Sequence, residues 1–495
     1  MSTSSQQGLH PKPLTRKTFL IKNVRLPVTP DDGSKSTINQ LYNVTCGDGR
    51  VDAVEPTDKA GAVCGNDEEL SERFDVILDA RGVGILLPGF VSHFTDTELQ
   101  SAEIELFNRL CHAHIHLDKC FLLDRCDELR TGDFAEALKV TAKAKAAFPS
   151  DLTDLYNRGK RLVIDSVQCG VTAMRAHVEV DKTVRMNCLD IGLKLKDEFQ
   201  TVCDMQICAF AQDPLFDAAS NGRPGGNYTL LQEAAKRKGV QAVGSAPYVE
   251  PSLEQAKRNM TLILDTAYES SLHADFHLDY NLDPTAEPLI WYLLEQLQER
   301  IKSGRWADGA RVCVGHATRL SLFSKEEWTR FRTTVEENKL PVTLVGLPPS
   351  DMYMMGRGQP GSPRATLNVS RLEREHGVKV AMAVNNVENA FTPQGTTDPL
   401  ALCPMGVAVF QYGTKKGCRT LIEAVTITAR KAIAAPSRQS LTPVKGDAAD
   451  FVLLHENDSL YSVALSPCYT RTVIKNGEVV ATRRADKWIR LVAQQ

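Results

Sequence analysis

The chain carries three histidines at alternating positions in the stretch Cys111-His112-Ala113-His114-Ile115-His116-Leu117-Asp118-Lys119. Successive side chains of a β-strand point to opposite faces, so we expect His112, His114 and His116 to share one face. Neutral imidazoles directed at one point bind zinc or iron, and a metal held in this way can activate water near neutral pH. A histidine-rich surface strand is the alternative. The apolar flanks and the apolar run at 84–91 favour a buried strand that binds metal.

Length, composition and charge are those of an ordinary soluble protein with more than one domain. The chain has 495 residues, of which 42% are hydrophobic and 24% charged, with a net charge of −3 and a pI near 6.4. This charge predicts no nucleic-acid partner and no membrane partner, and no apolar run is long enough to span a bilayer. The 13 cysteines form no Cys-x-x-Cys pair, and the N-terminus lacks an apolar signal core, so we expect a cytoplasmic protein with reduced thiols.

Both ends of the chain contain short apolar runs separated by turns. After a tail over residues 1–17 that we expect to be disordered, five runs between residues 19 and 87 predict strands. Residues 451–454 and the hairpin signal Asn476-Gly477 predict matching strands near the C-terminus. We therefore predict a small β-sandwich built from both chain ends, residues 18–89 and 440–495, with a larger domain inserted between them.

The inserted segment, residues 110–439, alternates strand-like runs with amphipathic helical runs. Helices are expected over 133–148, 152–168, 184–196, 230–238, 253–269, 288–302, 325–339 and 369–376. This succession indicates an α/β fold, either a parallel barrel or a doubly wound sheet. About eight strands can be counted, which favours a (β/α)8 TIM-like barrel, whose chemistry takes place at the C-terminal ends of its strands.

Several of the predicted strands end in residues suited to chemistry. These are His114 and His116, Arg175 and His177, Gln212, His277, His316, and Asn385 with Asn386. Any one of the histidines could be a core residue, and Asp279 and Asp283, which follow His277, could cap the next helix. Histidines at the same end of four strands nevertheless favour a site at the mouth of the barrel.

Motifs follow a fixed order along nearly the whole chain. They are Leu87-Pro88-Gly89, His114-Ile115-His116-Leu117-Asp118, Arg175-Ala176-His177-Val178, Ala209-Phe210-Ala211-Gln212, Phe276-His277-Leu278-Asp279, Val314-Gly315-His316-Ala317-Thr318, Pro393-Gln394-Gly395-Thr396 and Gly446-Asp447-Ala448-Ala449-Asp450-Phe451. In this order they resemble the amidohydrolase superfamily, and within it the cytosine deaminase and N-isopropylammelide amidohydrolase branch. Each motif alone is weak to moderate, and their common order carries the resemblance.

The resemblance implies a metal-dependent hydrolase with one divalent metal ion, zinc or iron. It implies that His114, His116 and His277 bind this ion. Asn385 stands where the family has a metal-contacting aspartate, and an amide can coordinate a metal through its oxygen.

The resemblance also implies the roles of residues around the substrate. His316 would orient the attacking water, and Gln212 would hydrogen-bond a planar amide or ring nitrogen. Asn386, Arg175 and His177 are further candidates for substrate binding, although core support by His177 is an equal alternative. We predict a small-molecule partner, a cyclic amide, amidine or aminopyrimidine-like compound, whose non-peptide C–N bond is cleaved. Homo-oligomers are common in the family, and the sequence does not test for one.

Two positions depart from the family pattern. Tyr280 stands where the family has a proton-shuttling glutamate, and a tyrosine with a pKa of about 10 is a poor substitute near neutral pH. Asn385 cannot accept the proton that the family aspartate receives. Losing a general acid–base group typically costs about a hundred- to ten-thousand-fold in rate.

Three interpretations of these departures stay open. Asp279 or Asp283 could have taken over proton transfer, which would give a hydrolase with altered chemistry. The protein could instead be a pseudoenzyme that binds metal and ligand without turnover. A three-histidine metal acting only as a Lewis acid, in an isomerisation or lyase step, is the third interpretation.

Residues 90–109 separate Pro88-Gly89 from the histidine-rich strand, whereas in the family the strand follows almost at once. A loop of this length is uncommon unless it is functional or disordered, and it could be a lid over the site. We also consider a gene-model artefact, because codons for Gly89-Phe90 and Asn108-Arg109 can read as a splice donor and acceptor in frame. Transcript reads would distinguish the two origins.

Overall fold

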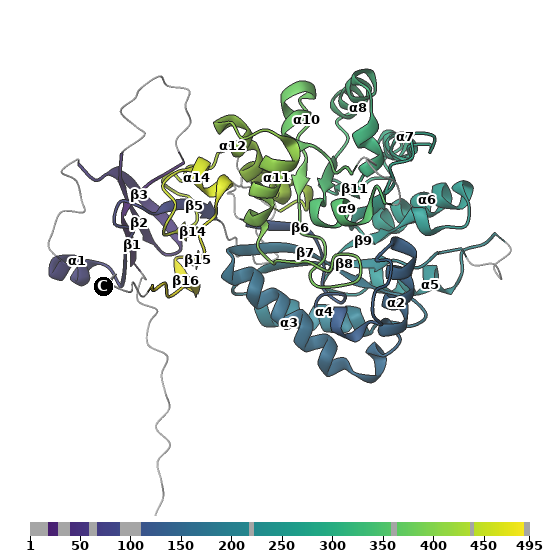
Figure 1. Cartoon of the computed structure of the whole chain (residues 1–495), viewed down its shortest axis with the longest axis horizontal. Helices are drawn as coiled ribbons and strands as arrows, with labels where there is room; N and C mark the ends of the chain where they lie inside the picture. Colours follow the sequence, from purple (N-terminus) through teal and green to yellow (C-terminus); the bar gives the residue numbers. More distant parts are fainter. Residues whose placement is uncertain are drawn as a thin grey trace, which may run out of the picture.

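The computed structural model describes residues 18–27, 40–58, 67–89, 110–216, 222–357, 364–435 and 440–489. The tail over residues 1–17 and the insertion at 90–109 lie outside these ranges. A pair of small sheets occupies one end of the molecule and a barrel with surrounding helices occupies the other (Figure 1). Among the described residues, no helix is both long and apolar enough to cross a membrane.

Eight parallel strands form the barrel, and they follow one another around the sheet in chain order. They are β6 (Leu110–His116), β7 (Val171–Glu179), β8 (Asp204–Ala211), β9 (Val240–Ser245), β10 (His273–Leu278), β11 (Val312–His316), β12 (Val342–Gly346) and β13 (Ala381–Met382). Backbone bonds join the two ends of this sheet: the His116 amide donates to the Asn385 carbonyl at 2.9 Å, and the Asn385 amide donates to the His114 carbonyl at 3.2 Å. The predicted (β/α)8 TIM-like barrel is confirmed.

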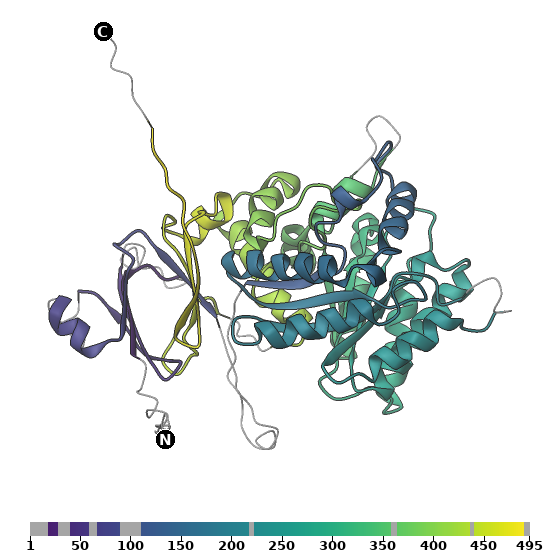
Figure 2. The same ribbon diagram turned by 90° about the horizontal axis from the view of Figure 1, so that it is seen from below.

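Helices surround the barrel strands (Figures 1 and 2). They are α2 (Phe134–Lys145), α3 (Leu152–Gln168), α4 (Asn187–Phe199), α5 (Gly226–Ala235), α6 (Leu253–Glu269), α7 (Ile290–Lys302), α8 (Lys325–Glu337), α9 (Pro348–Met354), α10 (Val369–His376), α11 (Leu402–Phe410), α12 (Lys415–Ala424) and α13 (Ile427–Ala432). Several begin at the capping residues that their sequences contain. For example, the Asp133 carboxylate accepts a hydrogen bond from the Glu136 amide at 2.9 Å, which satisfies a free amide in the first turn of α2.

Two segments differ from their sequence-based expectation. The apolar run over 378–384 predicts the last barrel strand, but β13 has two residues, because the chain then turns toward β6 and Asn385 adopts a φ of 70°. Residues 351–354, expected in a loop, belong to helix α9. Pro348 and Pro349 occupy the first turn of α9, where a missing amide costs no hydrogen bond.

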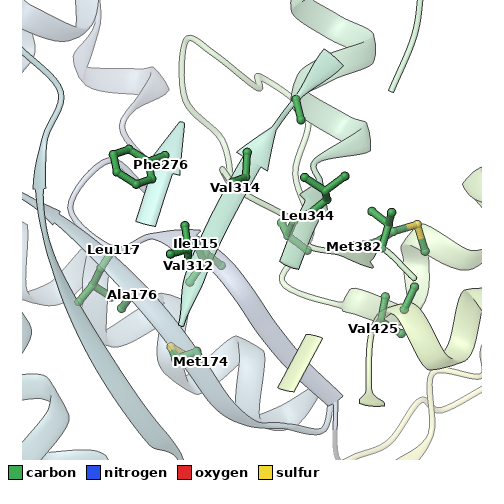
Figure 3. Close-up of a cluster of buried hydrophobic side chains, with 14 of the residues drawn as sticks. Ile115, Leu117, Met174, Ala176, Phe276, Val312, Val314, Leu344, Met382 and Val425 are labelled. Atoms are coloured by element: carbon green, nitrogen blue, oxygen red, sulfur yellow. The ribbon is translucent and has the colours of Figure 1, made fainter. Parts of the chain in front are cut away.

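Apolar side chains from the strands and helices form the main core around the barrel. Ile115, Ala176 and Phe276, each adjacent in sequence to a site histidine, belong to this core together with helix residues such as Leu162 and Ile263. Figure 3 shows part of it, with Phe276 and Ile115 among the labelled side chains. Because side chains alternate along a strand, burying these residues toward the helices directs the neighbouring histidines to the opposite face.

Two four-stranded sheets form the small sandwich. One has the order β3 (Arg50–Pro56), β2 (Tyr42–Gly47), β1 (Thr18–Val24), β4 (Val76–Asp79), and helix α1 (Asp67–Arg73) precedes β4. The other has the order β16 (Glu478–Arg483), β15 (Arg471–Lys475), β14 (Asp450–Leu454), β5 (Ile85–Gly89), with α14 (Leu460–Leu465) between β14 and β15. Strand β5 comes from the N-terminal part of the chain and pairs antiparallel with β14, so the sandwich is built from both chain ends as predicted.

The sheet that contains β15 lies between the other small sheet and the barrel (Figure 2). Arg471 on β15 joins it to the barrel body. Its guanidinium donates two hydrogen bonds to the Asp398 carboxylate, at 2.8 and 2.6 Å, and a third at 2.7 Å to the carbonyl of Cys169 at the end of α3. The Arg471 side chain is 1% exposed and that of Asp398 is 10% exposed, so water has little access to the pair.

We expect Arg471→Met to destabilise the protein by about 3–5 kcal/mol, because the buried Asp398 carboxylate loses two short hydrogen bonds and keeps only the more distant Arg483 guanidinium, at 3.6 Å, as a cationic partner among the described residues. Urea unfolding followed by circular dichroism measures this loss. Arg371→Met is the matched control, since Arg371 pairs with Glu375 at 2.8 Å on the surface of α10, where such a pair contributes about 1 kcal/mol or less. Equal effects of the two substitutions would show that the Arg471 pair does not join the two bodies.

Candidate metal centre

Three histidines from three strands bring their ring nitrogens together inside the barrel. His114 of β6, His177 of β7 and His277 of β10 each offer one nitrogen, and these three atoms lie within 4.8 Å of one another. The ring centroids of His114 lie 4.0 Å from His177 and 4.4 Å from His277. The three side chains are almost fully buried.

His116 lies beside this group. Its ring centroid is 5.1 Å from that of His277 and 5.3 Å from that of His177, and the residue is 2% exposed. The strand register explains the placement, because His116 is the β-sheet partner of His177. His112 is different: its Nε2 lies 3.2 Å from the Thr397 carbonyl, so it contacts the backbone rather than the cluster.

The donor set fits a divalent cation. Burial lowers the pKa of His114, His116 and His277 well below the ordinary value for histidine, so these rings are neutral and present lone pairs. Their Nδ1 atoms have no hydrogen-bond partner in the described part of the chain. The Nε2 atoms of His114 and His277 lie 2.5 Å apart, so the two rings direct these nitrogens to the same point.

The space for His114 depends on a glycine in β11, on another side of the barrel. A Cβ on Gly315 of β11 would lie 3.0 Å from Cε1 of His114 and 3.1 Å from its Nδ1. Any side chain at Gly315 would therefore displace the imidazole. Gly315 thus leaves room for His114, a candidate metal ligand. The next residue, His316, is itself a candidate catalytic residue.

A buried aspartate supports the cluster from within β10. Asp275 lies 3.2 Å from Nε2 of His177 and accepts a hydrogen bond from Arg175 at 3.0 Å. Burial opposes its ionisation, but attraction to His177 and Arg175 is stronger and lowers its pKa. Arg175 is fully buried and also donates to Gln206 at 3.0 and 3.2 Å, so the geometry favours a supporting role over its predicted substrate contact. Sequence reasoning missed Asp275, although its position two residues before His277 places it on the same strand face.

His316, at the end of β11, is hydrogen-bonded to a second buried aspartate. Its Nδ1 lies 2.8 Å from Oδ1 of Asp351, and Oδ2 of Asp351 accepts hydrogen bonds from Thr366 at 2.7 Å and from the Leu347 amide at 3.1 Å. Burial raises the pKa of Asp351, against the opposing effect of His316 and Thr366. The His316 ring centroid lies 5.3 Å from that of His277. No local sequence signal predicts this pair, because Asp351 lies 35 residues after His316.

Tyr280 occupies the position of the family glutamate. Its side chain packs against neighbouring rings and keeps its phenol hydrogen. Its ring stacks on His316 at 3.7 Å, and its hydroxyl donates to the Ser350 carbonyl at 3.3 Å. Burial raises the pKa of its phenol well above the ordinary value. Phe134 of α2 and Tyr248 contact the same ring at 5.8 Å, so Tyr280 belongs to an aromatic wall beside His316.

The two asparagines after β13 lie at the closure of the barrel. Asn385 is 1% exposed and donates from Nδ2 to the Ser350 hydroxyl at 2.7 Å. Its Oδ1 is buried, with no hydrogen-bond partner among the described residues, as expected for an oxygen that faces a cation or a ligand. Oδ1 of Asn386 accepts from Asn389 at 2.7 Å, which orients the Asn386 amide.

The aspartates proposed to rescue proton transfer serve local structure. Asp279 is buried, and its two oxygens accept the amides of Leu289 and Ile290, at 2.8 and 3.0 Å, at the start of α7. Asp283 is exposed, and its Oδ1 accepts the amide and hydroxyl of Thr285 at 2.8 and 2.7 Å. The geometry therefore favours the helix-capping alternative for Asp279, whereas Asp283 stabilises the turn at Thr285 rather than the helix.

Gln212 follows β8 and is 9% exposed. Its Oε1 accepts a hydrogen bond from the buried Lys119 at 3.1 Å, while its Nε2 is buried without a partner in the described ranges. Lys119 also pairs with Glu179 at 2.8 Å, and Glu179 pairs with Lys145 of α2 at 2.8 Å. These contacts hold the Gln212 amide in place and leave one of its donor groups for a ligand.

Solved structures show the same overall arrangement. A 5-methylcytosine deaminase from Klebsiella pneumoniae matches with a TM-score of 0.75 and 18% identity, over 95% of this chain and 100% of that one. The chain has the fold of this deaminase. An N-isopropylammelide isopropylaminohydrolase from Burkholderia multivorans matches with a TM-score of 0.68 and 20% identity, over 94% and 99% of the two chains. A zinc-bound adenosine deaminase from Xanthomonas campestris matches with 0.57 and 16%, over 94% and 93%.

These comparisons confirm, at the level of the fold, the resemblance to the amidohydrolase superfamily. No family model and no curated protein matches the sequence. The match to the deaminase covers 95% of this chain. It therefore includes the small sandwich as well as the barrel.

Proposed function

We propose that this protein is a metal-dependent hydrolase of the amidohydrolase superfamily that cleaves a non-peptide C–N bond of a small cyclic molecule. The observation that carries the proposal is the cluster of buried histidines, from strands β6, β7 and β10, inside the barrel. Solved structures of the same fold are named as deaminases and an aminohydrolase, so a pseudoenzyme gains no support from them.

In this proposal His114, His116 and His277 hold one divalent cation, zinc or iron, with the Asn385 oxygen facing it. His177 lies as close to His114 as His277 does and is an additional candidate ligand. When bound, the cation supplies Lewis acidity, which makes water a better nucleophile near neutral pH.

His316 and Asp351 would handle the proton that the family pattern assigns to carboxylates at positions 280 and 385. Asp351 accepts the Nδ1 hydrogen of His316, which fixes the tautomer and leaves Nε2 as the accepting atom. His316 Nε2 takes the proton from the attacking water, and the same atom returns it to the departing amine or ammonia. Gln212 and Asn386 would orient the planar substrate through their amides.

We expect Asp279→Asn and Asp283→Asn to keep kcat within about threefold of the unsubstituted protein, because asparagine caps helices and turns about as well as aspartate. Steady-state ammonia release by the two variants measures this. A loss of two orders of magnitude in either variant would restore that aspartate as the proton-transfer group.

Two measurements together test the proposed function. Metal content is determined by elemental analysis of the purified protein, and ammonia or amine release is screened over aminopyrimidines, aminotriazines and cyclic amides. Roughly one zinc or iron per chain with release from at least one class supports the proposal. A metal-bearing protein that is inactive on all classes but interconverts isomers would favour the Lewis-acid alternative instead.

The remaining expectations concern partners and location. We infer a small-molecule partner, with no nucleic-acid or membrane partner, and we leave the homo-oligomer as an expectation from the family. Twelve cysteines in the described ranges are free thiols, and this supports a reducing, cytoplasmic location.

A further inference from the structure

A separate cavity of about 230 Å³ lies beside the first turns of helices α8 and α10. None of its lining residues belongs to the histidine cluster. Its rim carries Lys325, Arg364 and Arg371, and there is no aspartate or glutamate among the described residues that line it. Glu375 pairs with Arg371 at 2.8 Å from outside the lining and partly neutralises it.

Two helices of eight or more residues begin at this cavity. Lys325 is the first residue of α8, and Asn368, which also lines the cavity, is the N-cap of α10. The N-terminal end of a helix carries a partial positive charge, which adds to the three cationic side chains. The first turn of α8 also carries Glu326 and Glu327, which do not line the cavity, so the excess of positive charge is confined to the lining itself.

The inner walls of the cavity are apolar and aromatic. Trp328 is 3% exposed and stacks on the His376 ring, with centroids 6.1 Å apart and planes inclined by 29°. Phe323 contacts Trp328 edge to face at 5.4 Å, and Phe410 is buried in the same lining. Cations at the rim and flat rings inside match a ligand with a planar body and a negative group.

We propose that this cavity binds a small planar organic anion, such as a monocyclic aromatic carboxylate. Its volume limits the ligand to about one ring with one anionic group. The carboxylate meets Lys325 and Arg364 at the rim, and the ring lies against Trp328.

The walls of the cavity connect to the pair that orients His316. Thr366 lines the cavity and donates the 2.7 Å hydrogen bond to Asp351. Ser321 and Phe323, which also line the cavity, belong to the segment that leaves His316 through the 3-10 helix at Thr318–Leu322. A ligand wedged between these walls moves Thr366 relative to Asp351, so the cavity is an effector site for His316.

The binding claim is tested on full-length, metal-free protein, so it does not depend on catalysis. Isothermal titration calorimetry compares benzoate with the neutral, isosteric benzamide, and Trp328 fluorescence reports contact with the ring. We expect benzoate to bind at least about tenfold more tightly than benzamide. Lys325→Gln/Arg364→Gln should remove that difference, whereas the equally charge-neutralising Lys236→Gln/Lys238→Gln on the exposed surface after α5 should retain it.

The outcomes are distinct. Equal binding of benzoate and benzamide, no binding of benzoate, or unchanged benzoate affinity in the Lys325→Gln/Arg364→Gln variant would each overturn the proposal. A His277→Ala variant that still binds benzoate with the same affinity supports this cavity, and one that loses binding would place the anion at the histidine cluster.

The effect on His316 rests on the proposed function and is tested separately on the metal-loaded enzyme. We expect saturating benzoate to lower kcat in the unsubstituted protein and to leave kcat unchanged in Lys325→Gln/Arg364→Gln. If benzoate binds without any change in kcat, the cavity is an anion site but not an effector site for His316.

Discussion

A His277→Ala variant should lose its bound metal and more than about a thousandfold of its turnover. His277 has a buried ring and is the residue of β10 that contributes a nitrogen to the cluster, beside that of His114. The expected loss exceeds the roughly 10–100-fold effect typical of residues that only support metal ligands. Elemental analysis and steady-state kinetics measure the two losses together.

Two matched variants serve as controls. One removes a residue that supports the metal ligands, and the other removes a histidine of the same strand that does not belong to the cluster. Asp275→Asn should weaken metal affinity by about 10–100-fold, because Asp275 contacts His177 and Arg175 behind the cluster. His273→Asn should leave metal content unchanged, because His273 lies on the same strand but uses Nδ1 to accept the Arg311 amide at 3.2 Å. If His277→Ala retains a full complement of metal, the proposed centre is wrong.

Asp351→Asn should lower kcat by about a hundred- to ten-thousand-fold while metal content and KM change little. The asparagine keeps the shape of the side chain but loses the negative charge, so the Nδ1 hydrogen of His316 is held less strongly and the wrong tautomer becomes accessible. The measurement is kcat and KM across pH for the metal-loaded variant.

The double variant Asp351→Asn/His316→Asn distinguishes a positioning role from a merely structural one. If Asp351 acts through His316, the double variant should be about as slow as His316→Asn alone, because the two residues work as a unit. Thr366→Val, which removes only the 2.7 Å bond to the far oxygen of Asp351, should have a smaller effect than Asp351→Asn. Full additivity of the two losses would contradict the proposed pair.

The boundaries of several helices and the C-terminal hairpin could be predicted, because the residues that determine them are neighbours in the sequence. Helices α3, α6 and α10 begin and end where their apolar spacing and caps predict. The hairpin at Asn476-Gly477 likewise follows from two adjacent residues, of which Gly477 has a φ of 72°. Strand β13 was predicted too long, because its end depends on pairing with β6 at the far side of the barrel.

The functions of charged residues were harder to predict than their positions. Asp279 was weighed as a proton carrier or a cap, and only the tertiary structure brings the Leu289 and Ile290 amides to it. The pairing of Asp351 with His316 was not predicted, because the two residues lie 35 positions apart and only the folded chain brings them together. Such pairings depend on how loops fold over the barrel mouth, and a single sequence carries no periodic signal for them.

The sequence by itself determined the parallel barrel, the split sandwich and the strands that bear the histidines, because alternating side chains and capping residues act over a few neighbouring positions. The tertiary structure alone decided that His177 joins His114 and His277, that Asp275 lies behind them, and that Asp351 holds His316. The physical reason is that barrel closure and strand register bring distant residues within hydrogen-bond distance, and that burial then excludes water and lowers the pKa of His114 and His277.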